Sequence, residues 1–143
     1  LNYAIDMRYG VLHDLAAKVW RGDPIELSMG WFNCIWQGDA NDWALRALDL
    51  CASPAKPLNV TGPEILSVRQ VVRRFGELLD RDPIVLGREE ETAYLNNSSL
   101  AAGLFGYPRI PVERLIEWTA DWVSRGGCSL NKPTHYEVRD GKY

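Results

Sequence analysis

The side chains that could carry out chemistry in this 143-residue chain are few and scattered. Three consecutive glutamates, Glu89 to Glu91, could bind a metal or act as an acid/base pair, but a run of like charge more often forms a solvated loop. His13 and His135 stand alone, with no serine elbow or paired carboxylate to make a hydrolase. We therefore predict no catalytic residue and no metal site within this chain.

The three cysteines are widely spaced and include no Cys-x-x-Cys pair of the kind used by structural zinc or redox sites. Cys34, Cys51 and Cys128 are predicted to be free thiols, which indicates a reducing, cytoplasmic location. Cys34 lies in an apolar strand-like run and Cys51 ends an apolar helix, so both are expected to be small buried hydrophobes. The six tryptophans are assigned mainly to the core, since buried aromatic rings supply much apolar area.

The bulk properties exclude several classes of function. The net charge is -3, and nucleic-acid binders usually have a basic face, so no nucleic-acid partner is expected. No apolar run approaches the roughly 20 residues of a membrane-spanning helix, and the first residues lack the pattern of a secretory signal, so no membrane partner is expected. A hydrophobic content of 46% favours one compact domain.

The segment from Leu58 to Phe75 has the clearest local pattern. Leu58 to Thr61 alternates like a strand, a Gly-Pro turn follows, and Ser67 with Gln70 forms a capping box at the start of a helix. Apolar residues then recur at helical spacing, which predicts one buried face. These residues are Val68, Val71, Val72, Phe75, Leu78 and Leu79.

The rest of the chain reads as short strands alternating with helices. Strands are predicted over 1–5, 25–27, 32–36 and 84–86, and helices over 8–21, from an Asp39 N-cap to Cys51, over 100–105 and over 111–123. With the Ser67 helix this gives about five helices. The sequence therefore predicts an α/β fold for residues 1–127, followed by an irregular tail over 128–143.

The order and spacing of these segments resemble the C-terminal half of extended short-chain dehydrogenase/reductases, the NAD-dependent epimerase/dehydratase family. The similar segments are Leu1 to Ala4, Arg21 to Ile25, Cys34 to Asp39, Leu58 to Phe75, Leu104 to Pro108 and Val112 to Val123. The resemblance implies an α/β fold that is the C-terminal substrate-binding part of an extended Rossmann-type enzyme. The absence of an initiator methionine also suggests an excerpt.

The residues that carry chemistry in this family are not found here. There is no Gly-x-x-Gly-x-x-Gly, and no tyrosine has a lysine four positions later. The resemblance therefore implies that NAD or NADP belongs to a full-length parent, that this chain alone binds no cofactor, and that it is inactive by itself.

The resemblance also implies a sugar-like small-molecule substrate and four candidate substrate-binding residues: Asn2, Tyr3, Arg8 and Arg88. Arg88 falls within one residue of an arginine that contacts phosphate in nucleotide-sugar members of the family. Another phosphate-binding arginine of those members is replaced here by Phe32 or Asn33, which makes a nucleoside-diphosphate sugar less assured. Asn2 could instead be an interior amide that is satisfied by the backbone.

Two other functions remain open from the sequence. The amphipathic helices could serve a protein partner in a free-standing interaction module, or the chain could be a small complete enzyme with an unrecognised site. We also expect the isolated chain to form a homodimer, because the strands at 1–5 and 58–61 would have exposed edges or the apolar faces would lack a cover.

Overall fold

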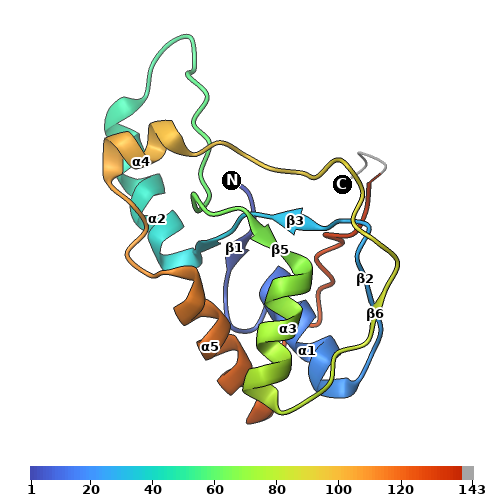
Figure 1. Ribbon diagram of the computed structural model, residues 1–143. Coiled ribbons are helices and arrows are strands. Elements are labelled where there is room, and N and C mark those ends of the chain that lie inside the picture. The colour runs from blue at the N-terminus through green and yellow to red at the C-terminus, as the bar shows by residue number, and fades with distance from the viewer. Residues whose placement is uncertain (140–143) are drawn as a thin grey trace.

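The structure is a computed structural model, and it describes residues 1–139. Three helices, α1 (Val11–Arg21), α3 (Val68–Leu79) and α5 (Val112–Ser124), pack against one another in the lower part of the molecule (Figure 1). Above them, α2 (Gln37–Arg46) continues into the 3-10 helix η1 (Ala47–Leu50) and lies beside α4 (Ser99–Phe105).

The strands of the described chain are two residues long and join in three separate pairs. Parallel pairs are formed by β1 (Ala4–Ile5) with β4 (Ile35–Trp36) and by β2 (Ile25–Glu26) with β6 (Val85–Leu86). The antiparallel pair is β3 (Trp31–Phe32) with β5 (Leu66–Ser67). The predicted α/β class, with short strands and five α-helices in the described part, is confirmed.

Helix α3 forms where its sequence pattern predicts. The Ser67 hydroxyl accepts a hydrogen bond from the Gln70 N–H at 3.3 Å, so Ser67 caps the helix. Phe75 is fully buried in the main core with most of the predicted apolar face, whereas Leu78 is 37% exposed. A second, smaller core lies between α2, α4 and β4 and contains Ile35, Ala40, Trp43 and Ala101.

Several local predictions are wrong. Helix α2 begins at Gln37, so Asp39 lies in its first turn and is not the N-cap; its buried carboxylate instead accepts from the Ile110 N–H at 3.0 Å. The apolar run at 32–36 is split into β3 and β4, and no strand is assigned at 58–61. Cys51 is exposed, and Trp43 alone among the tryptophans is buried.

The described part of the tail, residues 128–139, has no helix or strand but folds back over α1. Tyr136 is 2% exposed and belongs to the main core. The Thr134 N–H donates to the Asp14 carboxylate at 3.2 Å, and Arg139 donates to the carbonyls of Ser28 and Thr92. The tail is thus packed against the domain. No helix of the described chain is long and apolar enough to cross a membrane.

Candidate substrate-binding site

A buried amide, that of Asn33, joins several distant segments of the chain. Its side-chain oxygen accepts a hydrogen bond from the Asn2 side chain at 3.0 Å. Its nitrogen donates to the carbonyls of Asn96 at 2.7 Å and of Gly62 at 3.4 Å. Asn33 is 2% exposed, so these bonds compensate for the loss of water around a polar group.

The backbone around Asn33 holds these partners in place. Asn33 occupies the break between β3 and β4, and Asn2 precedes β1 with its N–H donating to the Val60 carbonyl at 2.9 Å. Gly62 donates its N–H to the Cys34 carbonyl at 3.0 Å. A Cβ on residue 62 would lie 2.1 Å from that oxygen, so the close approach requires glycine.

A cavity of about 650 Å³ opens beside this amide cluster. Its polar lining consists of Asn33, Asn96, Asn97, Ser98 and Ser99, and the remainder is apolar apart from Tyr107. None of the lining residues carries a charge. Amide and hydroxyl groups can both donate and accept hydrogen bonds, so the cavity suits a neutral ligand with many hydroxyl groups.

Asn2 and Tyr3, two of the four predicted site residues, contact Asn33 and Phe32 beside this cavity but do not line it. Asn2 is buried and acts on the cavity wall through its bond to Asn33. The Tyr3 ring packs edge-on against Phe32, with ring centres 6.4 Å apart, and its carbonyl accepts from the Ile35 N–H at 3.1 Å.

Arg8 and Arg88 lie elsewhere. Arg8 forms a two-bond pair with Asp6, each bond 2.9 Å long, and the arginine lowers the pKa of that carboxyl. Arg88 is exposed in the loop after β6. The next residue, Glu89, is held by Arg69 at 2.7 Å, and this hydrogen-bonded pair lowers the pKa of Glu89 to about 2. The structure therefore does not bring the four predicted residues into one site.

Positions 32–33, where nucleotide-sugar members of the family have a phosphate-binding arginine, carry no charged side chain in this protein. Phe32 is fully buried, and the Asn33 amide is engaged with protein groups. Asn96 to Ser99, which do line the cavity, were not predicted as site residues. Their sequence, two amides followed by two hydroxyls at the start of a helix, is notably polar, but their position beside Asn33 cannot be read from it.

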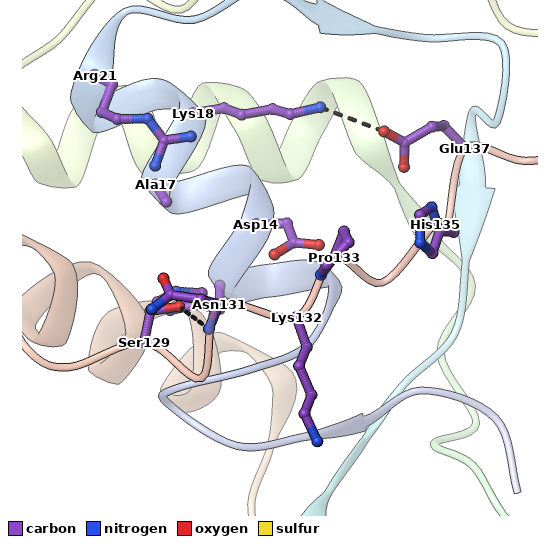
Figure 2. Close-up of a pocket in the computed structure, with 11 residues that line it drawn as sticks. Asp14, Ala17, Lys18, Arg21, Ser129, Asn131, Lys132, Pro133, His135 and Glu137 are labelled. Carbon is purple, nitrogen blue, oxygen red and sulfur yellow. Dashed lines mark hydrogen bonds and ion pairs between the residues drawn. The ribbon is translucent and has the colours of Figure 1, made fainter.

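A second cavity, of about 240 Å³, lies between α1 and the tail (Figure 2). Its charged groups are largely paired within the protein: Lys18 lies 3.5 Å from Glu137, and Arg21 pairs with Asp23 outside the cavity at 2.7 Å. The Lys132 side chain extends away from Asp14 in Figure 2. These contacts fasten the tail to α1 and do not converge on a ligand.

Comparison with solved structures identifies the fold. UDP-glucose 4-epimerase from Thermotoga maritima, solved with UDP-glucose, superimposes with a TM-score of 0.61 at 14% identity over 88% of this chain. UDP-glucose 4-epimerase from Thermus thermophilus, solved with NAD, gives 0.61 at 19% identity over 85% of this chain. The fold is that of the C-terminal part of these epimerases. RMD from Pseudomonas aeruginosa, in complex with NADPH, gives 0.60 at 16% identity over 80%.

The chain spans less than half the length of these structures, 43%, 42% and 43% in the same order. No protein-family model and no curated protein matches the sequence. The resemblance seen in the order of the sequence motifs is thus confirmed at the level of the fold.

Proposed function

We propose that this chain is the C-terminal, substrate-binding part of an NAD(P)-dependent sugar or nucleotide-sugar epimerase or dehydratase. The observation that supports this most strongly is an uncharged, amide-lined cavity within a fold shared with such epimerases. In the proposal, Asn2 acts as a positioning residue, because its bond to Asn33 fixes one wall of the cavity.

The cofactor would be held by a dinucleotide-binding half. The alignments cover 42% and 43% of the neighbouring structures solved with NAD and with NADPH, so more than half of each of those chains lies outside the aligned part. A dinucleotide's pyrophosphate is held by a glycine-rich turn that leads from a strand into a helix. The described residues contain no such turn, so they do not fit a dinucleotide. The role of this chain is therefore binding and orientation of the substrate, and it supplies no hydride-transfer group.

The cavity lining favours recognition of the sugar moiety. Asn33 is immobilised by its protein partners, and the Asn97 side-chain oxygen accepts from the Ser99 N–H at 2.9 Å, so the polar wall is organised before a ligand arrives. Tyr107 is 74% exposed and can cover the apolar face of a sugar ring. A diphosphate finds no cation in this lining.

Affinity measurements on two single variants test this assignment. Calorimetric titration of the chain with UDP-glucose is expected to show binding that Tyr107→Ala weakens by about tenfold, the equivalent of 1.4 kcal/mol. Trp20→Ala is the matched control, because Trp20 is an exposed aromatic on α1 that stacks with Arg81 outside the cavity. Equal loss of affinity in both variants, or no binding to the parent chain, would refute the assignment.

A further inference from the structure

The loop 87–98, which leads from β6 to α4, supplies part of the wall of the substrate cavity. Its last residues, Leu95 to Ser98, line the cavity. Residues 87–98 form no helix or strand, so the regular hydrogen bonds of secondary structure do not fix their path. The position of this part of the wall therefore depends on the contacts that the loop makes with other segments.

Side chains from other segments hold the loop near both of its ends. Near β6, the Glu89 carboxylate accepts two hydrogen bonds from Arg69 on α3, at 2.7 and 3.0 Å. Near α4, the Asn96 carbonyl accepts from the Asn33 amide at 2.7 Å. Between these two points, Ala93 packs against the main core and Thr92 contacts the tail.

The tail contact is made by Arg139, which joins the middle of the loop to the segment between β2 and β3. One guanidinium nitrogen donates to the Ser28 carbonyl at 3.0 Å and to the Thr92 carbonyl at 2.8 Å, and a second nitrogen donates to the Thr92 hydroxyl. The Glu90 N–H donates to the same Ser28 carbonyl at 3.3 Å. Figure 1 shows the red end of the tail beside the yellow loop. Hydrogen bonds from a charged donor are stronger than neutral ones, and the planar guanidinium fixes their directions.

The tail just before Arg139 is itself held in place. Tyr136 is 2% exposed within the main core. The Val138 N–H donates to the His135 carbonyl at 3.0 Å, which closes a turn beside Arg139. The guanidinium thus extends from a packed segment, so less conformational freedom is lost when it binds the loop.

We propose that Arg139 is a positioning residue for the substrate cavity. By holding Thr92 against Ser28, it sets the place of the loop end that brings Leu95 to Ser98 to the cavity wall. Its effect on a ligand rests on the proposed function, whereas its effect on the loop does not.

Amide hydrogen exchange of the whole ligand-free chain tests the effect on the loop. The Glu90 and Asn96 amides donate to Ser28 and to the Asn33 side chain, so their exchange reports opening of the loop. Arg139→Ala should speed both by about fivefold, because bonds from a charged donor are lost. The amide of Ala16, buried on α1, should keep its rate.

The matched control is Lys132→Ala, which removes another cation of the same tail, one that extends away from Asp14 in Figure 2. It should change none of these rates. Unchanged exchange at Glu90 and Asn96 in Arg139→Ala, or an equal increase at Ala16, would overturn the proposal whether or not the chain binds a sugar.

Two variants of Thr92 test its partnership with Arg139. Thr92→Ser keeps both acceptors and should exchange like the parent chain, whereas Thr92→Val has the same shape without the hydroxyl and should speed exchange at Asn96. Because the two residues act through one contact, adding Thr92→Val to Arg139→Ala should speed exchange no further. Additive effects would show that Thr92 acts independently of Arg139 and would contradict the proposal.

Calorimetric titration with methyl glucoside extends the test to the cavity. Arg139→Ala should raise the Kd by about fivefold, and Lys132→Ala should leave it unchanged. If loop exchange is faster in Arg139→Ala but the Kd is that of the parent, the positioning role is refuted. If the parent chain does not bind methyl glucoside, the proposed function fails, and the exchange rates alone decide whether Arg139 positions the loop.

Discussion

Among single residues, Asn33 has the largest structural role that is not apparent from its type. Its amide binds Asn2, Asn96 and Gly62 and thereby links the chain start, the β3–β4 break and the loop before α4. These hydrogen bonds compensate one another's buried donors and acceptors. Removing one partner leaves the other polar groups buried without a hydrogen bond to protein or water, which costs free energy of folding.

Replacing Asn33 with alanine should therefore destabilise the chain by about 1 to 3 kcal/mol, the cost of buried unsatisfied groups. The urea midpoint measures the effect. The control is Asn41→Ala, which removes an exposed bond to Gln37 on α2 and should change the free energy of unfolding by less than about 0.5 kcal/mol. Equal midpoints for both variants would show that the Asn33 cluster contributes nothing.

The Glu89 carboxylate gives a prediction about pH. Its pKa in the folded chain is about 2 because of Arg69, below the ordinary value of 4.5. A carboxyl whose pKa is lowered by folding stabilises the folded state above its ordinary pKa, and this contribution is lost as the pH falls through the folded pKa. Carbon-detected NMR titration should show the pKa rising toward 4.5 in Arg69→Gln. Arg73→Gln, on the same helix but paired with Glu77, should leave the Glu89 pKa unchanged.

The sequence indicates some of these residues better than others. The comparison of motifs predicted that Asn2 contacts the substrate and marked 32–33 as the position where an arginine is replaced. In the structure, Asn2 and Asn33 are hydrogen-bonded to each other in the amide cluster. Arg8 and Arg88 lie outside the cavity, since the loops that carry them turn toward Asp6 and toward solvent. Loop direction depends on contacts distant in sequence and is not encoded in local spacing.

At the scale of elements, α3 was the most predictable and α2 the least. In α3, the cap, the glycine turn and the apolar spacing agree, so local preference and packing select the same helix. In α2, Asp39 resembles a cap, but its carboxylate is taken by the Ile110 N–H and by Arg109, 3.5 Å away. A tertiary contact thus overrides a local capping preference.

Ser67→Ala should remove the α3 cap and destabilise the chain by about 1 kcal/mol, the usual value of an N-cap hydroxyl. Thermal melting of the variant measures the loss. Ser124→Ala, at the exposed end of α5, should leave the melting temperature nearly unchanged, because its hydroxyl caps no N–H group. An unchanged melting temperature for Ser67→Ala would contradict the capping role.

Phe75→Ala should cost more, about 3 to 5 kcal/mol, because the ring is fully buried and its removal leaves a cavity between α3 and its neighbours. The denaturant midpoint is the appropriate measurement. Leu78→Ala provides a control on the same helix, since Leu78 is 37% exposed and should have a much smaller effect. Similar midpoints for the two variants would mean that this face is not buried.

At the scale of the whole molecule, the order of the elements could be predicted, but the contacts between segments distant in sequence could not. The two-residue strands join only short stretches, and the side chains of Asn33 and Asp39 add bonds between segments distant in sequence. The tail reaches the core through Tyr136. Tyr136 follows no periodic pattern, so no helix or strand signal marks it as a core residue. The same long-range contacts place the uncharged cavity on one side of α4 and, on another side, an apolar groove lined by Leu50, Leu100 and Leu104.

The central claim, that the cavity binds a sugar moiety, is tested most directly by mapping amide chemical shifts of the ¹⁵N-labelled chain during titration with methyl glucoside, UDP-glucose and UDP. We predict that methyl glucoside and UDP-glucose shift the backbone and side-chain amides of Asn96 and Asn97 and the backbone amide of Tyr107, and that UDP alone does not. Shifts confined to the cavity between α1 and the tail, shifts with UDP alone, or no shifts at millimolar ligand would contradict the account.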